Sequence, residues 1–307
     1  NKYKVVLTAS AEECLNDLSM LNGIKVVFLS GIHSHDRNII LKYCISNSIN
    51  VFVIPRIGDT ILSGARSIHM FHLPMLQVSR YSAQPEYLFM KRAIDIVVSL
   101  IAAIILSPVF LITAIAIKAT DHGPIFYKQV RLTKDGKEFK ILKFRSMRVD
   151  AEKDGVARLS TGENDNRITS VGKIIRACRV DELPQLFNIL KGDLSIVGPR
   201  PERPELAEEI EEEIPEFCYR LKMKAGLTGY AQVTGLYDTL PYDKLKMDLM
   251  YIENYSIFLD LRIILMTLKT ALFPGETNEE ANAHDAQELL YQEEQMQEQE
   301  QEKGDHS

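Results

Sequence analysis

The feature that most constrains this chain is an uncharged apolar run of 22 residues, from Ile96 to Ile117. As one helix the run would be about 33 Å long, which matches the ~30 Å hydrocarbon core of a bilayer. Ser107 and Pro108 interrupt it near its middle, and either arm alone would extend only about 14 to 16 Å. Proline removes a backbone donor and disfavours helical geometry in the residue before it. The run therefore predicts either a kinked span or two short helices that enter a membrane and return.

The charges on both sides of the run separate these alternatives. Lys91 and Arg92 precede it, Lys118 follows it, and residues 124–148 carry eight basic side chains against two acidic ones. Positive side chains favour the cytoplasmic side of a membrane, and here both ends carry them. A single pass cannot place both ends on one side. We therefore predict a re-entrant helix–break–helix over residues 94–118, with Asp95 near the lipid headgroups.

The first 80 residues show a different pattern, in which apolar runs alternate with helix-like segments. The runs are 3–9, 24–29 and 50–55, and the helix-like segments are 11–21 and 36–47. This alternation predicts a parallel α/β sheet of Rossmann-like type. No Gly-x-Gly-x-x-Gly follows the first run, so a dinucleotide site has little support. We interpret residues 1–80 as an accessory domain for docking or for dimerisation, and in the second case the protein would be a homodimer.

Charge elsewhere in the chain is unevenly distributed. The overall net charge is −6, but residues 276–307 alone hold eleven acidic residues and one Lys. This Gln/Glu-rich tail has too little apolar surface to fold on its own, and we expect it to be disordered or a frayed helix. Within the basic segment, KEFKILKFRSM predicts a strand that carries Lys143 and Arg145. This strand is either a solvated edge protected by lysine or a surface for anionic headgroups or a polyanionic substrate.

The densest group of candidate site residues lies in residues 176–206. Leu183, Leu186, Phe187 and Leu190 fall at helical spacing, with Gly192 placed to end the helix and Asp181 near its start. In the simplest interpretation Asp181 is an N-cap and Glu182 interacts favourably with the helix dipole.

Four arginines around the acidic pair favour a chemical role instead: Arg176, Arg179, Arg200 and Arg203. Adjacent carboxylates on a helix point about 100° apart, so one can act as a nucleophile while the other holds a metal. Cations around such a carboxylate would neutralise charge on a phosphoryl group under attack. Magnesium fits, because it is commonly held by one or two carboxylates plus substrate phosphates. Arg200, stiffened between Pro199 and Pro201, is suited to grip a phosphate.

Several ordered motifs then support a resemblance that covers residues 90–273. They are KRAIDIVVSLIAAIILSPVFLITAIAIK, GPIFYKQVRLTKDGKEFKILKFRSM, DELPQLFNILKGDLSIVGPRP, AGLTGYAQVTG and YIENYSIFLDLRIILMTLKTAL. Together they resemble the bacterial sugar transferase family, the monotopic polyprenyl-phosphate phosphoglycosyl transferases. The resemblance implies an undecaprenyl-phosphate hexose-1-phosphate transferase on the cytoplasmic face of the bacterial inner membrane. The UDP-sugar would lose UMP to leave a covalent phosphosugar–aspartate, and undecaprenyl phosphate would then take up the phosphosugar. This would be the first membrane step of exopolysaccharide, capsule or O-antigen synthesis.

The resemblance also implies residue roles. Asp181 would match the nucleophile, Glu182 the Mg²⁺ ligand, Arg200 and Pro201 the nucleotide-binding turn, Lys143 and Arg145 the basic strand near the phosphates, and Ser107 and Pro108 the membrane-reversing break. Gln232, in a segment we interpret as a turn into a strand, could contact substrate, but a structural role is equally compatible. Two departures from the family pattern, Arg179-Val180 before the pair and Ala225 before GLTG, leave the pair itself intact.

The predicted architecture is thus an α/β Rossmann-like N-terminal domain and a mainly α, α+β monotopic membrane catalytic domain. After residues 1–80 come a linker (81–93), the re-entrant helix (94–118), the catalytic domain (119–275) and the tail (276–307). The expected partners are a UDP-sugar, undecaprenyl phosphate and the lipid bilayer, with no nucleic acid. Two rival functions remain: a non-catalytic membrane-bound scaffold or regulator that binds a nucleotide-sugar, and an ordinary glycosyltransferase that would release UDP.

Overall fold

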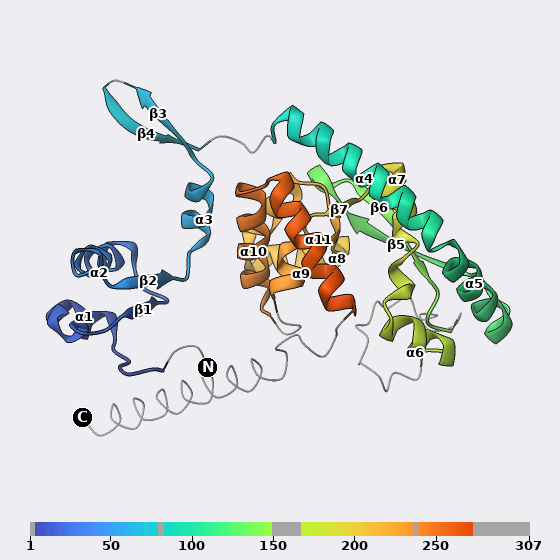
Figure 1. Cartoon of the computed structure of the whole chain (residues 1–307), viewed down its shortest axis with the longest axis horizontal. Helices are drawn as coiled ribbons and strands as arrows, with labels where there is room; N and C mark the ends of the chain where they lie inside the picture. Colours follow the sequence, from blue (N-terminus) through green and yellow to red (C-terminus); the bar gives the residue numbers. More distant parts are fainter. Residues whose placement is uncertain (1–3, 71, 79–82, 149–166, 236–238, 273–307) are drawn as a thin grey trace. The chain divides into compact units, whose positions relative to one another are not determined.

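The computed structural model describes residues 4–70, 72–78, 83–148, 167–235 and 239–272, which form a mixed helix and strand fold (Figure 1). The chain divides into two compact units, Asn1–Leu62 and Ser63–Ser307, and each is described by itself. The predicted C-terminal tail lies outside the described residues.

The first unit contains one pair of parallel strands. Its elements are α1 (Ala11–Asn16), η1 (Leu18–Leu21), β1 (Val26–Leu29), α2 (Ser34–Ser46), β2 (Asn50–Val53) and the start of α3 (Ile57–Ser63). β1 and β2 pair in parallel with α2 between them in sequence, as the alternating pattern predicts. The strand expected over 3–9 is wrong for residues 4–9, which are exposed and adopt no regular structure. Ser10 instead begins α1 through a capping box with Glu13.

The second unit begins with an antiparallel hairpin, β3 (Arg66–Met70) and β4 (Leu73–Gln77). The apolar run then forms α4 (Pro85–Ile105) and α5 (Ser107–Asp121), which meet at a bend of 61°. The helices break at Ser107, as predicted, and Pro108 lies in the first turn of α5, where its missing N–H costs little. Among the described helices none alone is long and apolar enough to cross a membrane, whereas the bent pair passes that test by length and composition.

The remaining elements build the core against which α4 and α5 pack. They are β5 (Phe126–Leu132), η2 (Lys134–Gly136), β6 (Glu138–Phe144), α6 (Ser170–Ala177), η3 (Val180–Glu182), α7 (Gln185–Lys191), β7 (Ser195–Val197), α8 (Pro204–Glu213), η4 (Pro215–Lys222), β8 (Gly226–Thr228), α9 (Tyr230–Thr234), α10 (Pro241–Glu253) and α11 (Ile257–Leu272). β6 is the strand predicted over KEFKILKFRSM; it pairs with β5 in an antiparallel hairpin, and Asp135 and Gly136 take positive φ in the tight turn. β7 and β8 pair in parallel.

Helix α4 has its polar side chains turned inward. Tyr87, Lys91, Asp95 and Ser99, spaced four residues apart, are all buried. Lys91 forms an ion pair of 2.9 Å with Asp260 of α11, so it is not a surface charge beside a membrane as the flanking-charge argument assumed. Asp95 likewise lies against the protein core, where it accepts hydrogen bonds from β7, and its depth near the headgroups stays a prediction. The face that α4 leaves exposed is apolar.

Candidate active site

The acidic pair lies in a short 3₁₀ turn, η3, and not on the helix that follows. Arg179, directly before η3, adopts a left-handed backbone with φ of 53°. Helix α7 begins at Gln185 after Pro184, and no side chain caps its start. The N-cap interpretation of Asp181 is therefore wrong. A non-glycine residue held in this conformation beside two carboxylates is the kind of backbone strain that concentrates at functional sites.

Glu182 is surrounded by cations from two other elements. Lys143 of β6 lies 2.7 Å from its Oε1, and the Arg200 guanidinium lies 3.6 Å from the same oxygen. Burial tends to raise the pKa of Glu182, but the charges of Lys143, Arg200 and Arg179 outweigh it and hold the pKa below its ordinary value. Glu182 is thus ionised across the neutral range and fixed in position.

Asp181 has the opposite electrostatic bias. Burial and the neighbouring negative charge of Glu182 raise its pKa above the ordinary value, although Lys143 and Arg176 act in the other direction. Two adjacent carboxylates with pKa values displaced in opposite directions are typical of groups with different chemical tasks. The structure therefore brings Glu182, Lys143 and Arg176 close to Asp181, and Arg200 close to Glu182.

The turn that carries Arg200 and Pro201 is fixed through its backbone carbonyls. Pro199 O accepts a hydrogen bond from Gly226 N (2.9 Å), and Arg200 O accepts one from Arg220 Nη2 (2.9 Å). Pro201 O accepts from Arg131 Nη1 (3.0 Å), and Glu202 O accepts from Leu132 N (2.9 Å). Four successive carbonyls are thus held from three directions: β8, η4 and β5. The Arg200 side chain itself remains 46% exposed. A rigid backbone that carries one accessible guanidinium is a preorganised anion-binding group.

Glycines allow this turn to approach β8 closely. A Cβ atom on Gly226 would lie 2.1 Å from Gly198 N, and one on Gly229 would lie 2.2 Å from Gly198 O. Both distances are far inside van der Waals contact with backbone, so no side chain fits at either position. The glycines of the GPRP and GLTG motifs therefore belong to one packed junction behind Arg200.

Two predicted site residues lie differently from expectation. Arg145 is buried at the base of the β5–β6 hairpin, where its backbone N–H donates to Ile125 O at 2.9 Å. Gln232 lies in the short helix α9, which follows strand β8. The predicted order, a turn that leads into a strand, is therefore wrong. Its Nε2 donates to Leu227 O at 3.5 Å, and among the described residues no hydrogen bond joins it to the acidic pair. A substrate contact by Gln232 stays a prediction.

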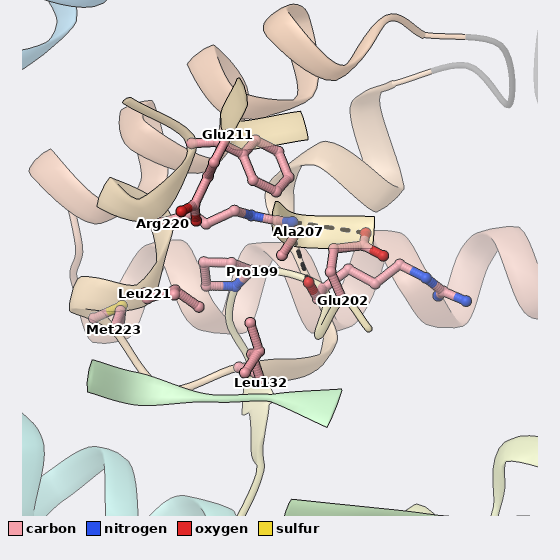
Figure 2. A pocket seen from close by; sticks show the side chains of 11 residues that line it. Leu132, Pro199, Glu202, Ala207, Glu211, Arg220, Leu221 and Met223 are labelled. Atoms are coloured by element: carbon pink, nitrogen blue, oxygen red, sulfur yellow. Dashed lines mark hydrogen bonds and ion pairs between the residues drawn. The ribbon is translucent and has the colours of Figure 1, made fainter. Parts of the chain in front are cut away.

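Three residues that support the Arg200 turn were not predicted from the sequence: Arg131, Arg220 and Asp248. Figure 2 shows Arg220 beside Glu202, at a cavity of about 10 Å³ that Leu132 and Pro199 also line. That volume holds no more than one water molecule. The turn is therefore packed tightly from behind.

The donor set restricts what metal the site could hold. Among the described residues no cluster of three or more His, Cys, Asp and Glu side chains is arranged for metal binding. A site closed by protein ligands alone thus has no support in this part of the chain. Asp181 and Glu182 do fit the mode in which one or two carboxylates and substrate phosphates share Mg²⁺.

A turn of two carboxylates with Lys143, Arg176 and Arg200 close by is electrostatically suited to a polyanionic substrate. Residues 86–274 match the family described as bacterial sugar transferase. A protein of Aeromonas hydrophila, UDP-N-acetylgalactosamine-undecaprenyl-phosphate N-acetylgalactosaminephosphotransferase, is 40% identical over 235 residues, which are 76% of this chain and 54% of that protein. A UDP-glucose:undecaprenyl-phosphate glucose-1-phosphate transferase of Klebsiella pneumoniae is 43% identical over 196 residues, covering 62% of this chain and 41% of that protein.

A third relative is shorter. The exopolysaccharide production protein PSS of Rhizobium leguminosarum bv. phaseoli is 42% identical over 200 residues, which are 62% of this chain and 98% of that protein. This chain therefore spans about half the length of the first two relatives but nearly all of the third. The chain belongs to the bacterial sugar transferase family, as its motifs predict.

Proposed function

We propose that this protein transfers sugar-1-phosphate from a UDP-sugar to undecaprenyl phosphate and releases UMP. One observation carries the proposal: Asp181, with its raised pKa, stands beside a Glu182 that Lys143 and Arg200 hold ionised. The names of the relatives support the substrate classes, since they describe transfer from UDP-sugars to undecaprenyl phosphate. The name of the Rhizobium leguminosarum relative, an exopolysaccharide production protein, supports a role in glycan assembly.

In the first step an ionised oxygen of Asp181 attacks the phosphorus bonded to the sugar. The bond from that phosphorus to the bridging oxygen breaks, and UMP leaves with the bonding electrons. In the second step a phosphate oxygen of undecaprenyl phosphate attacks the same phosphorus, and the Asp181 carboxylate is released. Lys143, Arg176 and Arg200 lie where they would offset negative charge on the phosphoryl oxygens. A raised pKa makes Asp181 a better nucleophile than an ordinary aspartate, provided that it is ionised.

We propose Glu182 as the protein ligand for Mg²⁺, shared with the phosphates of the donor. Among the described residues, Lys143 and Arg200 both approach Glu182 at Oε1. When bound, Mg²⁺ would supply positive charge to the leaving phosphate.

The reaction is tested by the nucleotide released. Purified protein is given Mg²⁺, undecaprenyl phosphate and a panel of UDP-sugars. UMP supports the proposal, UDP would indicate an ordinary glycosyltransferase, and no nucleotide would favour the binding scaffold. Intact-mass analysis without lipid acceptor tests the intermediate: wild type should gain a phosphosugar, and an adduct that persists in Asp181→Asn would mean that the nucleophile is another residue.

We propose further that α4 and α5 form a re-entrant membrane element on the cytoplasmic face of the inner membrane. Both ends of the pair contact the same core, through the Lys91–Asp260 ion pair and through Ile117, which packs with Phe144 and Ile175. Large apolar side chains of α4, α5 and α11 face outward: Val97, Ile101, Ile104, Leu111, Ile112, Ile115, Phe258, Leu261 and Leu265. Such a surface suits the acyl region and its boundary.

Labelling in sealed vesicles tests this topology. The exposed Cys178 and Cys218 are replaced by Ser, and single cysteines are introduced at the exposed Glu86 and His122, before and after the helix pair. A membrane-impermeant reagent should reach both positions from one side only. Labelling from opposite sides would require a span and rule out re-entry.

For the first unit we propose a Rossmann-like accessory module that serves docking or dimerisation. The parallel β1–β2 pair with α2 in the connection supports it, as does the lack of a Gly-x-Gly-x-x-Gly sequence. Light scattering of the chain with and without residues 1–62 tests the role in dimerisation. If the number of chains per particle is the same with and without residues 1–62, the first unit has no role in dimerisation.

A further inference from the structure

Arg220 connects the Arg200 turn to helix α10. Its side chain, in η4, is 6% exposed, and its partner Asp248 in α10 is 1% exposed. Asp248 Oδ2 accepts a hydrogen bond from Arg220 Nε at 3.0 Å, and Nη2 lies 2.7 Å from the same oxygen in the ion pair. Nη2 also donates to the carbonyl oxygen of Arg200, and Nη1 lies 3.6 Å from Glu202. One guanidinium therefore has its direction set by Asp248 and its other contacts on the turn.

Stability alone is a poor reason for this arrangement. Two charges taken out of water lose hydration that their mutual attraction only partly returns, and buried ion pairs are often replaceable by apolar residues without loss of stability. What an apolar pair cannot reproduce is a directed donor to Arg200 O. The planar fork of arginine provides that donor and the contact with Asp248 at once, which a lysine cannot.

We propose that Arg220, oriented by Asp248, is a positioning residue that fixes the backbone at Arg200 so that the Arg200 side chain stays beside Glu182. This inference rests on the proposed function, in which Arg200 grips the donor phosphates. Arg220 is buried and does not touch substrate itself. Because the small cavity beside it is bounded by Pro199 and Glu202, a shorter side chain at 220 leaves room into which the turn can move.

The test separates positioning from folding by replacing the whole ion pair. Arg220→Met with Asp248→Val removes both charges together, so no unpaired buried charge remains, and Met can pack on Phe217, over whose ring the guanidinium now lies at 4.7 Å. The matched control removes the Arg37–Asp59 ion pair of the first unit with Arg37→Met and Asp59→Val. Melting temperature, UMP release and hydrogen exchange of the Leu132 and Gly226 amides, which donate to Glu202 O and Pro199 O of the turn, are measured for each.

We expect the Arg220/Asp248 variant to stay folded and to exchange these amides faster. Its kcat/KM should fall at least about tenfold, because misplacing a positioning group by ~1 Å can cost about 10²-fold. The control variant should keep wild-type values for both. In an Arg200→Ala background the same pair replacement should cost little further activity, since the residue through which it acts is already gone. The proposal would be overturned if the pair replacement lowered kcat/KM by the same factor with and without Arg200. It would also be overturned if the pair variant kept wild-type activity and exchange.

If the pair variant does not fold, Arg220→Lys is used instead, because it keeps the charge opposite Asp248 but loses the fork. It should show the same faster exchange, and its loss of activity should disappear in the Arg200→Ala background. Exchange at the wild-type rate would overturn the proposal. If wild-type protein releases no UMP, the proposed reaction fails. The exchange of the turn then decides the positioning role independently.

Discussion

Replacing Asp95 tests whether the entry to the apolar run is held by protein or by lipid headgroups. Its side chain is 4% exposed, and its two oxygens accept hydrogen bonds from Ser195 Oγ at 2.8 Å and Ile196 N at 3.0 Å. A hydrogen bond to a charged group contributes about 1.5–3 kcal/mol, and Asp95→Leu removes two of them. The free energy of unfolding should therefore fall by about 3–6 kcal/mol. For a unit of this size that corresponds to a decrease in melting temperature of at least about 6 °C.

Thermal unfolding in detergent or nanodiscs, followed by circular dichroism at 222 nm, measures this effect. Asp95→Asn is the matched control, because its amide oxygen still accepts from Ile196 N–H and the Ser195 hydroxyl can rotate to accept from the amide NH₂. Asn should cost only about 1–2 kcal/mol, since the hydrogen bonds survive without the charge. A decrease below ~2 °C for Leu, or equal decreases for Leu and Asn, would refute the buried assignment and return Asp95 to the headgroup region.

Three further predictions concern the site. Asp181→Asn should abolish UMP release yet raise the melting temperature, because a raised pKa means that the ionised form costs stability at any pH above the unfolded-state value. For the same reason UMP release should decline on acidification at a higher pH than an ordinary aspartate would give. Lys143→Met should move that decline further up, since Lys143 lowers the pKa of Asp181; a pH–rate profile that does not move would contradict this. Gly226→Ala should lower the melting temperature and weaken UMP release, because its Cβ would lie 2.1 Å from Gly198 N, whereas Gly58→Ala, with open space in helix α3, should be neutral or slightly stabilising.

Features set by neighbouring residues were predictable from the sequence. Pro108 determines where α4 gives way to α5, the KDG turn joins β5 to β6, and Gly192 ends α7 with φ of 100°. Each depends on the backbone preference of one or two residues. The strand expected at 3–9 failed because an apolar, β-branched run becomes a strand only when another strand pairs with it, and residues 4–9 have no strand partner among the described residues.

The site residues that are close together in the sequence could also be predicted, whereas those far apart could not. Asp181 and Glu182 are adjacent, and Arg200 follows within 20 residues, so one segment contained enough to suggest the chemistry. Arg131 and Asp248 lie 69 and 48 residues from Arg200, and nothing local distinguishes them from other surface charges. Only the tertiary fold brings them to the carbonyls of the turn or to Arg220. Both are long-range partners, which periodicity and spacing do not predict.

In the apolar helix pair, the contacts of Lys91 change the grounds on which re-entry is proposed. Lys91 was interpreted as a charge that faces the cytoplasmic surface, but in the structure it is buried against Asp260. That removes it from the positive-inside argument, because a paired and buried charge does not report on a membrane surface. The same ion pair supplies a stronger constraint, since it ties the start of α4 to α11, while Ile117 ties the end of α5 to Phe144 of β6. Two ends fixed to one folded core cannot lie on opposite faces of a bilayer unless that core also crosses it. The geometry therefore favours re-entry without any appeal to flanking charge.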